Sequence, residues 1–163
     1  MGLRKNIIGV IGAGRASAEG EQLAGEVGRL IAEAGGVMVC GGLDGVMAAA
    51  SRGCADAGGE VIGILPGASA QEANEHVTLA VPTNMGHARN IIIAHTAQAL
   101  IAVEGEYGTL SEAAIALKLG KKVFALRPQF ELDGITVVAS PQEAVARVLE
   151  TISGTNRGDD HVV

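Results

Sequence analysis

The chain has 163 residues, enough for one domain with a hydrophobic core. Its net charge of −6 and its lack of a basic stripe argue against nucleic-acid binding, and it has no apolar run long enough for a membrane-spanning helix. Cys40 and Cys54 lie in apolar surroundings, which is typical of reduced core thiols in a cytoplasmic protein. We expect one phospholigand-binding domain over 1–153 and a frayed tail over 154–163.

Apolar runs alternate with helix-like segments along the chain. Strands are predicted at 6–12, 37–42, 60–66, 76–82, 99–103, 121–126 and 135–140, and helices at 17–35, 44–58, 84–98, 109–120 and 141–152, the first with Ser17 as N-cap. The strands are apolar throughout, which is typical of a parallel sheet covered by helices on both faces. The sequence therefore predicts an α/β, Rossmann-like, doubly wound fold with a mainly parallel sheet.

Glycine-rich loops follow four of the predicted strands. They are "GAGRAS" (12–17), "CGGLDG" (40–45), "PGASAQEAN" (66–74) and "EGEYGT" (104–109). Ligands of such sheets bind beyond the carboxyl ends of the strands, where the strand order reverses. Helix N-termini at these loops would offer unpaired N–H groups and partial positive charge. The loops therefore predict a crevice for a phosphorylated or otherwise anionic small molecule.

The first loop also has part of the dinucleotide-binding pattern G-x-G-x-x-G. It supplies the first two glycines, but Ser17 stands at the third position. The second strand ends in "VCGG", without the acidic residue that would bind a ribose hydroxyl. The sequence therefore disfavours NAD(P) as the ligand.

Three segments together resemble the LONELY GUY family and its relatives. They are 40–67, "NMGHARN" (84–90) and "EGEYGTLSE" (104–112). That family comprises Rossmann-like cytokinin nucleoside-monophosphate phosphoribohydrolases, long mislabelled lysine decarboxylases. The "ARN" and "GTLSE" forms are more similar to a sister branch, which contains the molybdenum cofactor carrier protein and uncharacterised bacterial proteins. The resemblance covers residues from about 7 to 150.

The family signature is P-G-G-x-G-T-x-x-E, with an upstream arginine that is usually followed by lysine. The matching residues are Gly105, Gly108, Thr109, Glu112 and, upstream, Arg89. The departures are Glu104 for proline, Glu106 for the second glycine and Asn90 for lysine. We expect Glu104 to face a hydroxyl or amine of the ligand and Glu106 to weaken anion binding.

Two functions remain open on this resemblance. The favoured one is a binding or carrier protein for a phosphorylated nucleotide-like or pterin-like ligand, with a nucleotide or a molybdopterin-type molecule as the candidate. The alternative is a nucleoside 5′-monophosphate phosphoribohydrolase, an N-glycosidase in which Arg89 orients the phosphate or leaving base. Glu112 would then stabilise the ribose centre or activate water. Lysine decarboxylation has no support, and no metal site is predicted.

The expected ligand-binding residues lie in or beside the glycine loops. They are Gly12, Gly14, Arg15, Gly41, Gly42, Asp44, Gly45, Met85, Arg89, Asn90, Glu104, Gly105, Gly108 and Thr109. Two purely structural alternatives stay open: Thr109 and Glu112 form a T-x-x-E capping box, and Arg89 is a solvated surface residue. Alanine-rich helices and a mean hydropathy of +0.32 also predict a homodimer or larger homo-oligomer.

Overall fold

The structure is a computed structural model that describes residues 4–158. Within these residues, seven strands form one sheet in which every neighbouring pair is parallel. The strands are β1 (Ile7–Gly12), β2 (Val37–Cys40), β3 (Glu60–Leu65), β4 (Leu79–Pro82), β5 (Ala99–Val103), β6 (Val123–Leu126) and β7 (Thr136–Val137). The predicted parallel α/β fold is therefore confirmed.

The strand order is β4-β3-β2-β1-β5-β6-β7. The chain thus builds the sheet outward from β1 to β4, and then returns to place β5 on the other side of β1. Gly12 at the end of β1 pairs with Val103 at the end of β5, so both carboxyl ends lie at one level. This reversal beside β1 is the point at which open α/β sheets bind their ligands.

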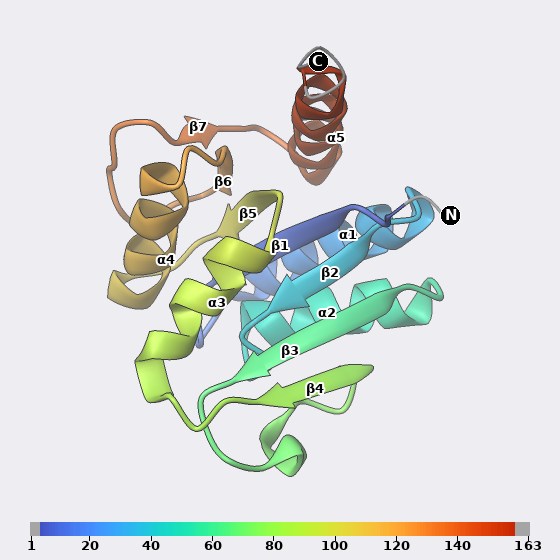
Figure 1. Ribbon diagram of the computed structural model, residues 1–163, viewed down its shortest axis with the longest axis vertical. Helices are drawn as coiled ribbons and strands as arrows, with labels where there is room; N and C mark the ends of the chain where they lie inside the picture. Colours follow the sequence, from blue (N-terminus) through green and yellow to red (C-terminus); the bar gives the residue numbers. More distant parts are fainter. Residues whose placement is uncertain (1–3, 159–163) are drawn as a thin grey trace.

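Helices cover both faces of the sheet (Figure 1). They are α1 (Ala18–Glu33), α2 (Val46–Asp56), α3 (Arg89–Thr96), α4 (Tyr107–Lys118) and α5 (Pro141–Gly158), with one-turn 3-10 helices η1 (Ala70–Glu72) and η2 (Gly86–Ala88). Apolar residues of α1, α2 and α5 share one core cluster with Ile8 and Val10 of β1, whereas those of α3 and α4 share a second cluster with Ile11. The alternating directions of the β1 side chains therefore supply both cores.

Small residues allow α1 and α2 to pack closely against each other. A Cβ atom on Gly28 of α1 would collide with the backbone oxygen of Ala50, and one on Gly53 of α2 would collide with that of Gly25. The small side chains Ala113 and Ala116 of α4 are likewise buried under the sheet's other face. Part of the small-residue surface that predicted self-association is therefore used inside the chain, and self-association stays a prediction.

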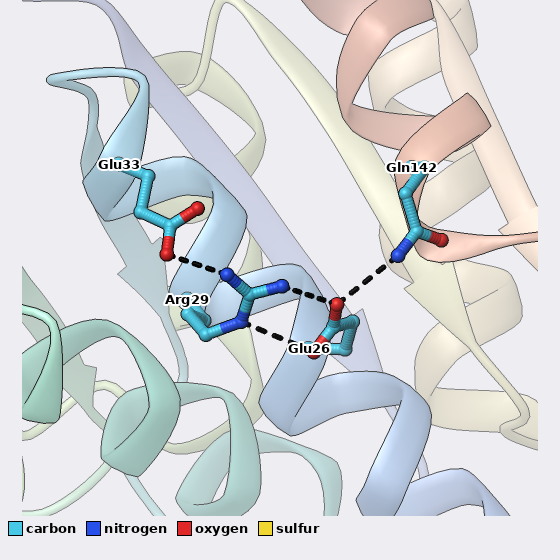
Figure 2. Close-up of polar contacts among 4 residues, drawn as sticks. All are labelled: Glu26, Arg29, Glu33 and Gln142. Carbon is cyan, nitrogen blue, oxygen red and sulfur yellow. Dashed lines mark hydrogen bonds and ion pairs between the residues drawn. The ribbon is translucent and has the colours of Figure 1, made fainter.

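A polar network joins α1 to α5 on the outside of the molecule (Figure 2). Arg29 lies between Glu26 and Glu33 of α1 and is 2.5 Å from the Glu33 Oε1 atom. Gln142 Nε2 of α5 donates to Glu26 Oε1 at 3.1 Å. Hydrogen bonds from Arg29 lower the pKa of Glu26. These exposed contacts connect α5 to α1 beside the apolar packing between the two helices.

Several element boundaries differ from the predicted ones. The helix predicted at 84–98 starts only at η2 and continues as α3, because Asn84 and Gly86 have positive φ angles of 53° and 58°. Helix α5 continues to Gly158, so the tail expected from 154 begins inside a helix, and residues 159–163 lie outside the described range. None of the described helices has the length and apolar character that crossing a membrane requires.

The two cysteines are free and buried, as predicted. Cys40 ends β2 and its Sγ atom lies 3.6 Å from the Ser51 hydroxyl oxygen, whereas Cys54 lies in α2. Burial raises the pKa of the Cys54 thiol to about 11. Both residues therefore act as small core side chains.

Candidate functional site

A cavity of about 760 Å³ opens at the carboxyl ends of the central strands. It lies where β1 and β5 end side by side, with α4 beginning after β5 and the N-terminus of α3 approaching from the β4 side (Figure 1). Its lining residues are Val10, Ile11, Gly12, Ala13, Gly14, Arg15, Gly41, Met47, His87, Arg89, Asn90, Glu106, Tyr107, Gly108, Thr109, Glu112 and Gln129. The cavity therefore occupies the place that the strand reversal predicts.

Most of the predicted site residues line this cavity. They are Gly12, Gly14, Arg15, Gly41, Arg89, Asn90, Gly108, Thr109 and Glu112. The predicted residues outside its lining are Gly42, Asp44, Gly45, Met85, Glu104 and Gly105. The 66–74 loop also lies elsewhere, because Asn74 N–H donates to the Gly42 carbonyl at 2.8 Å and holds this loop beside the loop after β2.

Asp44 and Gly45 line a different and larger hollow of about 1230 Å³, between α1 and α2 on the other side of the loop. Gly42 and Gly45 instead serve the backbone, with positive φ angles of 74° and 65° that glycine adopts without strain. A side chain at Gly45 would also collide with the backbone of Ala13 and Gly14. Gly42 and Gly45 are therefore explained by chain geometry.

Glu104 points to α1 and not into the cavity, which corrects the expectation that it meets the ligand. Its Oε2 atom accepts from the Ser17 N–H at 3.0 Å, and its Oε1 atom accepts from the Ser17 hydroxyl. Ser17 Oγ in turn accepts from Gly20 N–H at 3.0 Å, as predicted for an N-cap. The Ser17 hydrogen bonds lower the pKa of Glu104. The carboxylate that replaces the family proline therefore binds the N-terminus of α1.

The capping-box interpretation of Thr109 and Glu112 is wrong. Helix α4 begins at Tyr107, with Glu106 as an N-cap whose side chain makes no capping hydrogen bond. The reason is the preceding turn, in which Glu104 and Gly105 have φ angles of 52° and 102° and start the helix two residues before Thr109. Thr109 instead packs on Gly105, where a Cβ atom would collide with its side chain.

This helix start leaves backbone donors at the cavity. The first helical hydrogen bond of α4 runs from Leu110 N–H to the Glu106 carbonyl, at 2.9 Å. The N–H groups of Tyr107, Gly108 and Thr109 precede it and therefore have no partner within the helix. These three residues line the cavity at the positive end of the helix dipole, which suits an oxyanion.

Arg89 is a buried cation, so its interpretation as a solvated arginine is wrong. It is the first residue of α3, and only 8% of its surface is exposed. A Cβ atom on Gly41 would lie 2.8 Å from Arg89 Nη2, so glycine at this position leaves room for the guanidinium. Arg89 Nη1 donates to Asn90 Oδ1, but its buried Nε has no hydrogen-bond partner. Burial lowers the pKa of Arg89.

Glu112 lies one turn into α4 and is only 7% exposed. Burial raises the pKa of its carboxyl to about 7, and the nearby charge of Arg89 opposes this rise. Within residues 4–158, no ion pair shorter than 4.0 Å joins the two residues. The cavity therefore holds a fixed positive charge beside a carboxyl group that titrates near neutral pH.

The cavity thus combines backbone N–H donors, a buried guanidinium and a carboxyl group able to exchange protons near pH 7. In the described part of the chain, no three His, Cys, Asp or Glu side chains gather as a metal site would require. The cavity is also lined by side chains that the sequence does not predict for the site, namely Met47, His87, Tyr107 and Gln129. Tyr107 lay inside the recognised motif, but Gln129 follows β6, and only the strand order brings it to the cavity.

Comparisons with known proteins agree with the architecture of the fold. The chain matches the sequence profile of the SLOG cluster4 family over residues 5–153. An uncharacterised protein from Archaeoglobus fulgidus is 49% identical over 138 residues, which are 85% of this chain and 91% of that protein.

Two solved structures are similar over nearly their whole length. The molybdenum cofactor binding protein from the phototrophic bacterium Rippkaea orientalis has a TM-score of 0.87 at 35% identity, with 93% of this chain and 99% of that chain covered. The molybdenum cofactor carrier protein from Chlamydomonas reinhardtii has a TM-score of 0.84 at 36% identity, with 91% and 99% covered. The resemblance to the carrier-like branch is confirmed, and the chain belongs to the SLOG cluster4 family.

Proposed function

We propose that this protein binds and carries a small phosphorylated ligand, nucleotide-like or pterin-like, in the cavity at the ends of β1 and β5. The observation that carries this proposal is the unpartnered, buried Nε atom of Arg89. A buried donor without an acceptor costs about 1–3 kcal/mol, and more when the group is charged. An anion in the cavity would offset this buried positive charge.

The phosphate would lie between Arg89 and the first turn of α4. Gly108 and Thr109 offer backbone N–H groups there, and Arg89 offers its guanidinium. Charge-assisted hydrogen bonds of this kind are roughly twice as strong as neutral ones. Asn90, which accepts from Arg89, would keep the guanidinium directed along the cavity wall.

The named relatives support a carrier for a pterin-type ligand. Two structures that match nearly the whole chain are those of proteins that bind or carry the molybdenum cofactor. A molybdopterin-type molecule is therefore the first candidate cargo, and a nucleotide is the second. A cavity of about 760 Å³ falls within the ~300–1,000 Å³ typical of small-molecule sites.

Hydrolysis of a nucleoside 5′-monophosphate is the alternative function, and the Glu112 carboxyl favours it. A carboxyl group with a pKa of about 7 is suited to acid–base catalysis at neutral pH, and it shares the cavity with Arg89. In that reaction Glu112 would stabilise the ribose centre or activate water. The exposed Glu106 at the same cavity weakens phosphate binding in either function and therefore does not separate the two.

Two measurements separate these functions. The first is mass spectrometry of small molecules that copurify with the native protein, and we expect a phosphorylated heterocycle. The second is incubation with AMP and the other nucleoside monophosphates, followed by chromatography for free base. The carrier proposal predicts thermal stabilisation by a ligand without base release. Base release that is lost in Glu112→Gln would establish the glycosidase instead.

A further inference from the structure

Tyr107 is a large aromatic residue that lies at the cavity with most of its surface exposed to solvent. It is the only tyrosine in a chain with no tryptophan and two phenylalanines. Phe124 is 5% exposed in one core cluster, and Phe130 packs against the other. Tyr107, by contrast, lines the cavity with 86% of its surface exposed. It is therefore the one aromatic side chain that the hydrophobic cores do not use.

The backbone that carries Tyr107 is held in place. The turn before it contains two positive φ angles, at Glu104 and Gly105, and the Glu104 carboxylate is bound by Ser17, the N-cap residue of α1. Tyr107 is then the first residue of α4. Its ring consequently projects from a fixed point beside the same N–H groups that suit a phosphate.

We infer that Tyr107 binds the ligand by stacking against a planar nitrogen heterocycle whose phosphate lies at Arg89 and the start of α4. This inference rests on the proposed function. A tyrosine ring offers a large flat contact at low conformational cost, and stacking accepts any base because every base has a π face. The ligand is then a heterocycle joined to a phosphate by a short spacer, and a sugar phosphate alone would use only half of the site.

The composition of the chain provides a direct optical test. Because Tyr107 is the only tyrosine and tryptophan is absent, tyrosine emission from the unlabelled protein reports on this residue alone. Titration with GMP or a pterin monophosphate should quench this emission saturably, beyond the quenching of free N-acetyltyrosinamide at equal absorbance. Ribose 5-phosphate, which has the phosphate without the ring, should bind more weakly and leave the emission unchanged.

Substitutions at the same position separate stacking from other roles. By calorimetry, Tyr107→Ala should weaken GMP binding roughly tenfold, and Tyr107→Phe should keep the affinity of the unchanged protein. Tyr107→Ala should leave binding of ribose 5-phosphate unaltered. Val137→Ala removes a 63% exposed apolar side chain from β7, outside the cavity, and is the matched control.

Three results would overturn the inference, and they have different meanings. Binding that depends on Arg89 but is equal in Tyr107→Ala would remove the stacking role and leave the proposed function standing. A change of molecular mass in Tyr107→Ala, without loss of affinity, would assign the ring to contact with a second copy of the chain. Absence of saturable binding of both GMP and the pterin monophosphate to the unchanged protein would contradict the proposed function together with the inference.

Discussion

Replacing Glu112 by Gln should stabilise the protein by an amount that grows with pH. The pKa of this carboxyl is raised from 4.5 to about 7 in the folded chain, with burial as the main cause. Each pKa unit is worth about 1.4 kcal/mol, so ionisation costs the folded state about 3 kcal/mol more than the unfolded state. Glutamine has nearly the same shape and never ionises.

The direction of the effect follows from proton binding. Between pH 4.5 and 7, the folded chain keeps a proton at Glu112 that the unfolded chain has released, so this residue lowers stability as pH rises. Below that window it contributes nothing, and above it the full penalty applies. Glu112→Gln should therefore gain about 1 kcal/mol at pH 5 and about 3 kcal/mol at pH 8.

Urea unfolding of both proteins at pH 5, 6, 7 and 8 gives the difference in unfolding free energy directly. Glu150→Gln, at an exposed position on α5, is the control, and it should change stability by less than ~0.5 kcal/mol at every pH. A gain from Glu112→Gln that is the same at all four pH values would refute the reasoning. The carboxyl would then titrate alike in the folded and unfolded chains.

Three further predictions concern the ligand and the assembly. A sulfate ester, whose charge is constant over this range, should bind more tightly at pH 6 than at pH 8, because a neutral Glu112 repels it less; calorimetry on Glu112→Gln should show no such difference. Glu106→Gln should tighten phosphate binding by roughly two- to fivefold through loss of repulsion, and equal affinity would exclude Glu106 from the site. Light scattering at micromolar concentration should give at least a dimer, since edge strand β4 exposes Leu79 and Val81; a monomeric mass would contradict this.

The fold could be predicted because its determinants are local. The all-apolar segment 99–103 matches β5, and Ser17 marks the start of α1. The position of the cavity then followed from a general rule of parallel sheets. Gly12, Gly41 and Arg89 were found because glycines after strands and the family motif identify the same edge of the sheet.

The parts that could not be predicted depend on contacts between distant residues. The sequence directs Glu104 to the ligand, whereas its partner in the structure is Ser17. This partner is 87 residues away, and no local pattern indicates such a hydrogen bond. The sequence places the start of α4 at Thr109, two residues too late. The cause is the φ angle of 52° at Glu104, which a sequence does not indicate for a residue other than glycine. The T-x-x-E pattern gave a plausible but wrong helix start. The burial of Arg89, and with it the unpartnered Nε, required the packed structure.

Calorimetric titration with a pterin monophosphate and with GMP tests the central claim most directly, using the unchanged protein, Arg89→Ala and Arg52→Ala. Arg52 is an exposed arginine on α2 and lies outside the cavity. Its replacement by Ala changes the net charge by the same amount as Arg89→Ala. We predict one saturable site per chain, an affinity about 10- to 100-fold lower in Arg89→Ala, and no change in Arg52→Ala. Equal affinities in all three proteins, or no saturable binding of either compound, would contradict a phosphate site built on Arg89.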